Sequence, residues 1–136
     1  MSGLPQFNVA AFREAAIHLR ELGYEVVSPC ELDDVSGIGE AVLANANGDV
    51  SKLTAETGET WGSLLARDVH TIADHGIEGI VCLPGWHRSK GAKLEVFVGL
   101  LKQIPIFLYM DAPRLPHELR RNVVLEAIYD NMKERS

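Results

Sequence analysis

The sequence has only two cysteines, no apolar run long enough to cross a bilayer, and no excess of basic residues. Cys30 and Cys82 are isolated and show no paired spacing, as expected for reduced thiols in a cytoplasmic protein. The formal net charge of −6 argues against duplex nucleic acid and leaves small anionic ligands possible. The first residues are polar and include Pro5, so we expect no signal peptide.

What is present suits one globular domain. The chain has 136 residues, of which 46% are hydrophobic, enough for a real core. It contains no internal repeat and no low-complexity tract. We therefore treat residues 1–136 as a single domain.

The stretch 77–101, IEGIVCLPGWHRSKGAKLEVFVGLL, predicts a strand, a tight loop and a helix. Residues 77–83 are mostly apolar and β-branched, which suits a buried strand, and Pro84 and Gly85 end it. Ser89 is a good N-cap for the helix that follows. In open α/β sheets, ligands bind at loops of this kind, just past the carboxyl ends of strands. We expect the buried stripe of this helix to consist of Leu94, Phe97, Val98 and Leu101.

The start of this helix carries the candidate chemistry. Ser89 offers a hydroxyl, and Gly91 lets a ligand approach the backbone closely. Glu95 lies four residues after Gly91, so the two share a face of the helix. Free amides at the helix start favour an anion, and we expect them to keep Glu95 ionised. An ionised, positioned carboxylate is what a nucleophile on a sugar carbon must be. The pattern also fits an ordinary capped helix with a surface glutamate.

The chain before this stretch predicts a helix over 9–22 and a short strand over 24–28, which Pro29 ends. Residues 31–60 are polar and contain four glycines. A short helix is expected at 38–46. The rest of about 33–60 is expected to be a long polar loop, either a surface excursion or a substrate lid.

The rest of the chain predicts helices that alternate with strands. Thr60 or Ser63 is expected to cap a helix that runs to Ala73, and residues 104–110 predict another buried strand. Pro116 suits the first position of a last helix that ends near residue 133. Alternation of this kind predicts an α/β fold, with a mostly parallel sheet and helices on both of its faces.

Several motifs taken together resemble a known family. The chain begins Met-Ser-Gly-Leu-Pro-Gln-Phe-Asn and has Leu-Gly-Tyr-Glu-Val-Val-Ser-Pro at 22–29. It also has Arg67-Asp68 on the central helix and Leu-Pro-Gly-Trp-His-Arg-Ser-Lys-Gly-Ala-Lys-Leu-Glu at 83–95. This combination resembles proteins related to nucleoside 2-deoxyribosyltransferases, in an uncharacterised phage and bacterial branch that is similar to deoxynucleoside 5′-monophosphate N-hydrolases. The likeness covers most of the chain outside 33–60.

The resemblance implies a flavodoxin-like (Rossmann-like) fold and cleavage or transfer at the N-glycosidic bond of a 2′-deoxynucleoside or its 5′-monophosphate. It implies that Glu95 is the nucleophile, that Ser89 holds a 5′-phosphate, and that Asp68 assists the leaving base or orients the substrate. Gly3 would line the same pocket. The resemblance also implies a homo-oligomer, a dimer or larger, that works in the cytoplasm, including a host cytoplasm if phage-encoded. The chemistry needs no cofactor and no metal.

The chain departs from this pattern at its start, where Met1 stands at the family's loop methionine. We therefore expect the fold to lack the usual first strand. This departure keeps open a second function, a non-catalytic nucleotide-binding or sensing module of the same fold.

Further side chains near this loop have two interpretations each. Trp86 fits a ring that stacks on a base, and it fits equally a packing residue. His87, with Arg88 and Lys90, fits an anion site or a solvated loop. His70 and Asp74 share a helix face, but a zinc site would require a third ligand.

Overall fold

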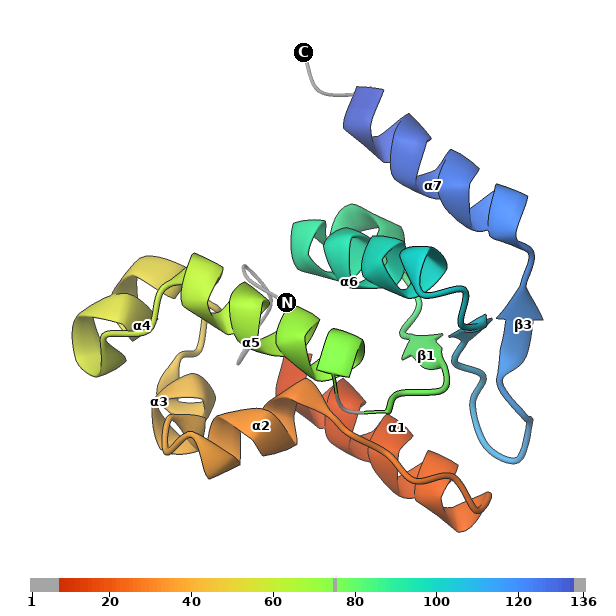
Figure 1. Ribbon diagram of the computed structural model, residues 1–136. Coiled ribbons are helices and arrows are strands. Elements are labelled where there is room, and N and C mark those ends of the chain that lie inside the picture. Colours follow the sequence, from red (N-terminus) through yellow and green to blue (C-terminus); the bar gives the residue numbers. More distant parts are fainter. Residues whose placement is uncertain (1–7, 75, 134–136) are drawn as a thin grey trace. The chain divides into compact units, whose positions relative to one another are not determined.

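The computed structural model describes residues 8–74 and 76–133. They form a mixed α/β structure with seven α-helices and a three-stranded sheet (Figure 1). The chain divides into two compact units, Met1–Ala66 and Arg67–Ser136. The boundary falls inside helix α5 (Trp61–Asp74). The expected single domain stays a prediction.

The first unit is helical throughout its described elements. Its helices before α5 are α1 (Val9–Glu21), α2 (Pro29–Val35), α3 (Gly39–Ala44) and α4 (Val50–Thr57). Their apolar side chains form one buried cluster, whose core members are Val9, Cys30, Ile38, Val42 and Leu53. This cluster explains why four short helices hold together, since helices of this length are marginal without tertiary packing.

The strand predicted over 24–28 is wrong. The segment is irregular in the structure, and its backbone bonds to the adjoining helices and to one side chain instead of to a neighbouring strand. Arg20 Nη2 donates to Val26 O at 2.9 Å and to Glu31 Oε1 at 2.6 Å, and so bridges α1, this segment and α2. Pro29 then lies in the first turn of α2, where proline is well tolerated.

The long polar loop predicted over about 33–60 is also wrong for most of its length. The expected short helix is present as α3, but α2 extends to Val35 and α4 was not foreseen. Asp49 caps α4 and accepts from Ser51 N at 2.9 Å and Lys52 N at 3.3 Å. Leu53 is only 1% exposed. The signal was an N-cap Asp followed by apolar residues at helical spacing.

The second unit contains the sheet. Strands β1 (Ile80–Cys82), β2 (Ile106–Leu108) and β3 (His117–Leu119) lie in that order. β1 and β2 are parallel, with Ile80 opposite Ile106, whereas β2 and β3 are antiparallel. The sheet is therefore mixed. The expected strands at 77–83 and 104–110 are present in shortened form.

The last helix does not begin at Pro116. Residues 117–119 form β3 instead, because they extend the sheet along the free edge of β2. Helix α7 (Arg121–Lys133) follows, and Arg121 Nη2 donates to Leu100 O at 2.7 Å. Pro116 therefore does not start the helix, because the residues that follow it pair with β2.

Helix α6 (Lys90–Leu101) packs through a different face from the predicted one. It buries Val96, Gly99 and Leu100, while Phe97 and Leu101 are exposed, Leu101 by 70%. The helix is apolar on most sides, so spacing alone does not select a face. Gly99 decides it, because a helix can approach the sheet closely where it carries no side chain.

The core of the second unit joins this face of α6 to one face of the sheet and to α7. Its buried members are Cys82, Trp86, Val96, Leu100, Ile106, Val124 and Ile128. Cys82 and Ile106 are strand residues of this cluster, and Ile80 and Leu108, at alternate positions, pack against it. The opposite face carries Val81, which is exposed. A covering of helices on both faces stays a prediction.

Candidate functional site

The candidate site joins a carboxyl group on α5 to one on α6, both in the second unit. The start of α5 is fixed by reciprocal bonds: Ser63 N donates to Thr60 Oγ1 at 3.0 Å, and Thr60 N donates to Ser63 Oγ at 2.8 Å. The predicted capping by Thr60 is confirmed. At the other end, Lys102 Nζ donates to Ile72 O at 2.7 Å. This bond ties the last turn of α5 to the end of α6.

Asp68 lies on α5 with its side chain only 16% exposed. Its Oδ1 accepts two hydrogen bonds from the neighbouring guanidinium, from Arg67 Nε at 3.0 Å and from Arg67 Nη2 at 2.9 Å. Burial raises the pKa of Asp68, while the charge of Arg67 and its hydrogen bonds oppose that rise. A hydrogen bond from Glu95 also lowers the pKa of Asp68.

Glu95 is the partner of Asp68, across from α5 on α6. Burial, the negative charge of Asp68 and the hydrogen bond between the two carboxyls raise the pKa of Glu95 to about 8. Glu95 is therefore mostly protonated at pH 7 and donates the hydrogen bond to Asp68. Two carboxyls that share one proton in this way are a recurrent arrangement of acid–base sites.

The expectation that helix-start amides keep Glu95 ionised is wrong. Helix α6 begins at Lys90, and the side chain of Ser89 already accepts from Ala92 N at 3.2 Å. That amide is occupied by the cap, and Glu95 lies beyond the first turn, where the effect of the helix dipole is small. Burial and the nearby Asp68 charge therefore dominate.

The end of β1 lies close to the carboxyl pair. Burial, together with the nearby Glu95, raises the pKa of the Cys82 thiol to about 12. Cys82 is thus a neutral, buried thiol and not a nucleophile. The carboxyls lie near the carboxyl end of β1, as predicted for a ligand site in an open α/β sheet.

The loop between β1 and α6 contains the short helix η2 (Trp86–Arg88). Trp86 is 9% exposed and belongs to the core cluster, which supports its interpretation as a packing residue. Its indole meets the His87 ring edge-on, with ring centroids 6.1 Å apart. Ser89 caps α6, and Gly91 lies in the first turn of that helix. Gly3 lies outside the described residues.

A family model described as a domain of unknown function matches residues 1–107. The chain belongs to the DUF4406 family. The part that matches DUF4406 contains Asp68, Ser89, Gly91 and Glu95, together with α1 to α6. It ends within β2, so β3 and α7 lie beyond it. No curated protein and no solved structure matches this DUF4406 chain.

Within residues 8–74 and 76–133 of the DUF4406 chain, no three His, Cys, Asp or Glu side chains are grouped as a metal site. His70 Nδ1 lies 2.9 Å from Asp74 Oδ2 on the exposed side of α5. Within the same ranges, no helix has the length and apolar character needed to span a bilayer.

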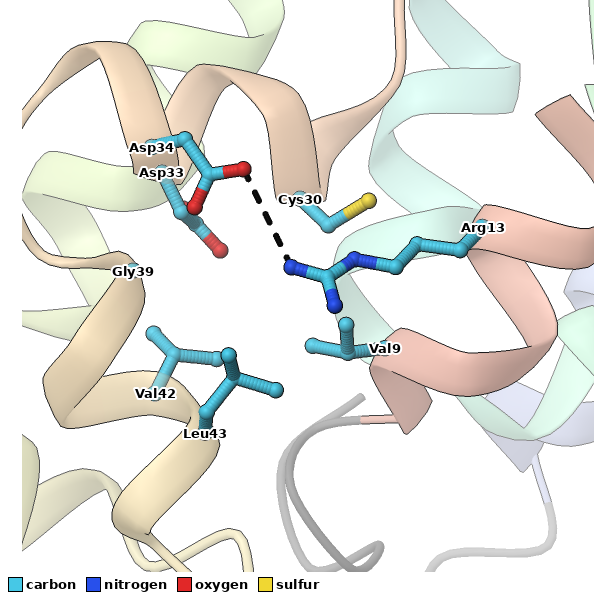
Figure 2. A pocket seen from close by; sticks show the side chains of 8 residues that line it. All are labelled: Val9, Arg13, Cys30, Asp33, Asp34, Gly39, Val42 and Leu43. Atoms are coloured by element: carbon cyan, nitrogen blue, oxygen red, sulfur yellow. Dashed lines mark ion pairs between the residues drawn. The ribbon is translucent and has the colours of Figure 1, made fainter. Parts of the chain in front are cut away.

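A second cluster of charged groups, which sequence reasoning missed, lies in the first unit of the DUF4406 chain. Figure 2 shows Arg13 reaching toward Asp34, with Nη2 and Oδ2 3.9 Å apart, and both residues line a pocket. Asp33 of the same pocket is buried. The pocket floor is apolar, with Val9, Val42 and Leu43. Cys30 and Gly39 complete its lining.

Proposed function

We propose that this protein cleaves or transfers the N-glycosidic bond of a 2′-deoxynucleoside or its 5′-monophosphate. The observation that carries the proposal is the partly buried Asp68–Glu95 pair, whose two carboxyls are hydrogen-bonded to each other and in which the pKa of Glu95 is raised to about 8. Glycosidic cleavage needs a carboxylate for the sugar and a proton for the leaving group. A pair with one shared proton supplies both.

Glu95 releases its proton to Asp68, and its carboxylate attacks C1′ as the bond from C1′ to the base nitrogen breaks. Asp68 passes the same proton to the departing base. Water or a second base then takes the sugar from Glu95, and the proton released in that step restores the pair. Acid–base help of this kind is worth about 10²–10⁴-fold in rate.

The start of α6 suits a phosphate group of the substrate. The Ser89 hydroxyl oxygen accepts one bond from Ala92 N, which leaves its own hydrogen free to donate to a phosphate oxygen. Gly91 carries no side chain over the backbone beside it, and His87, Arg88 and Lys90 add basic groups around the loop. These features favour a nucleotide over a nucleoside. Gly3 completes the substrate-binding residues that the family resemblance implies.

We also propose that the chain is related to nucleoside 2-deoxyribosyltransferases and shares their flavodoxin-like arrangement. The parallel unit formed by β1, α6 and β2 is consistent with that arrangement. On this relationship the protein is a cytoplasmic homo-oligomer that needs no cofactor.

A second function, a nucleotide-binding module without turnover, is favoured by one observation. Glu95 with a pKa of about 8 is a poor nucleophile at neutral pH until its proton moves. If substrate binding does not move the proton to Asp68, the site binds and does not cleave.

Product analysis separates the two functions. The native protein is incubated with a panel of deoxynucleosides and their 5′-monophosphates, and free base is measured by chromatography. Glu95→Gln and Asp68→Asn are run alongside, with Glu126→Gln as a matched control, because Glu126 is an exposed helical glutamate of the same unit.

Free base from the native protein and from Glu126→Gln, with loss of at least 100-fold in Glu95→Gln, would support catalysis. No free base, but a raised melting temperature with one nucleotide, would favour the binding module. If the native protein releases no free base and no nucleotide raises its melting temperature, both functions are contradicted.

A further inference from the structure

Arg67 has a place in the site that the proposed chemistry does not yet use. It directly precedes Asp68 on α5, and consecutive residues of a helix do not normally face each other. Its guanidinium nevertheless places both Nε and Nη2 on a single oxygen, Asp68 Oδ1, at 3.0 and 2.9 Å. The side chain is 22% exposed, so this is a charge-assisted contact with limited solvent screening.

The two carboxyls of the pair have different surroundings. Asp68 receives the guanidinium directly, whereas Glu95 meets Asp68 and lies near the neutral thiol of Cys82. Arg67 on α5 acts on both carboxyls, through hydrogen bonds to Asp68 and through its charge on Glu95, and Cys82 on β1 lies near Glu95. A cation on one carboxyl stabilises the ionised form of that carboxyl and leaves the proton to the other.

We propose that Arg67 is a positioning residue, which places the single proton of the pair on Glu95 and keeps Asp68 ionised in the resting protein. Its importance for turnover rests on the proposed function. Because Arg67 makes Asp68 a weaker base, a proton that passes through Asp68 is released more easily to the leaving base. Arg67 thus sets both where the proton rests and the pH range over which the pair holds one proton.

The first test needs no substrate. Side-chain carboxyl carbons are labelled with ¹³C, and the titrations of Asp68 and Glu95 are followed by NMR in the native protein, Arg67→Lys and Arg67→Gln. Arg120→Gln is the matched control, since Arg120 is exposed in the same unit. In the native protein Asp68 is expected to titrate at lower pH than Glu95.

In Arg67→Gln the midpoint for Asp68 is expected to move up by about one pH unit or more, the lower end of what an adjacent arginine does. The midpoint for Glu95 is expected to move up less, so the difference between the two titration midpoints becomes smaller. Arg67→Lys keeps the positive charge but loses the paired N–H donors of the guanidinium. Its Asp68 midpoint is therefore expected to lie between those of the native protein and Arg67→Gln. An unchanged Asp68 midpoint in Arg67→Gln, or a native protein in which Asp68 titrates above Glu95, would overturn the proposal. If Arg67→Gln does not fold, Arg67→Lys is compared with the native protein instead, and a smaller upward shift of the Asp68 midpoint is expected.

A second readout distinguishes this proposal from the proposed function. If the native protein releases free base, the pH profile of kcat/KM is expected to shift to higher pH in Arg67→Lys, whereas a purely structural role would lower the rate equally at every pH. If no base is released but the NMR midpoints move as described, the proposed function fails and the role of Arg67 in placing the proton stands. If base is released and the midpoints do not move, the proposed function stands and the role of Arg67 in placing the proton is overturned.

Discussion

Glu95 on α6 donates a hydrogen bond to Asp68 on α5, and this bond makes one proton common to two partly buried carboxyls. The pair lies within the second unit, near the end of β1. Its consequences for stability can be measured without knowing any substrate.

The first prediction concerns pH. The pKa of Glu95 is raised from its usual 4.5 to about 8, so the folded protein binds a proton that the unfolded chain releases between these values. The contribution of Glu95 to stability is therefore fully present below about pH 4.5 and is lost as pH rises toward 8. The free energy of unfolding is expected to fall by up to about 1.4 kcal/mol per pH unit in this window, the slope for one proton.

Urea unfolding at pH 5, 6, 7 and 8 checks this prediction. Glu95→Gln has no titrating group at position 95, so its free energy of unfolding is expected to vary less with pH than that of the native protein. Glu126→Gln is expected to keep the native dependence. Equal slopes for Glu95→Gln and the native protein would contradict the raised pKa.

The second prediction concerns the approach of α6 to the sheet. A Cβ atom placed on Gly99 would lie 2.6 Å from Ile80 Cδ1 and 3.1 Å from Ile106 Cδ1. Gly99→Val is therefore expected to destabilise the protein by about 1–3 kcal/mol through overpacking. Gly62→Val, at an exposed helical glycine of α5, is expected to change stability little. Chemical denaturation measures both, and a neutral Gly99→Val would show that α6 does not pack through this face.

The third prediction tests whether 33–60 is a folded part of the core. Leu53→Ala is expected to lower the free energy of unfolding by about 2–5 kcal/mol, because it leaves a cavity among the helices of the first unit. Val35→Ala, at a side chain that is 87% exposed, is the control and is expected to be nearly neutral. A mobile loop would instead make the two variants alike, with fast amide exchange across 50–57.

The fourth prediction concerns a buried amide. Asn45 Oδ1 accepts from Asp49 N at 2.9 Å, and its Nδ2 donates to Asp49 O at 2.7 Å, so one side chain closes the turn before α4. Asn45→Ala leaves both backbone groups without this partner and is expected to cost about 1–3 kcal/mol. Asn122→Ala, at an exposed position of α7, provides the comparison. Thermal unfolding that is equal for the two variants would contradict the structural role of Asn45.

Sequence alone was sufficient where the signal is local. Ser89 as the cap of α6, a cap of α5 at Thr60 or Ser63 and the strand, loop and helix within 77–101 all follow from neighbouring residues, because capping and turn chemistry act over three or four positions. The same is true of the placement of Glu95 on a helix just after a strand.

Tertiary structure alone decided the features that depend on distant partners. The segment 24–28 has β-branched residues but meets Arg20 instead of a strand, and 117–119 follows a helix-starting proline but pairs with β2. The buried face of α6 was chosen by the contact of Gly99 with Ile80, and the proton on Glu95 by burial beside Asp68. Pairing, close packing and desolvation depend on residues far away in the sequence, so no local pattern encodes them.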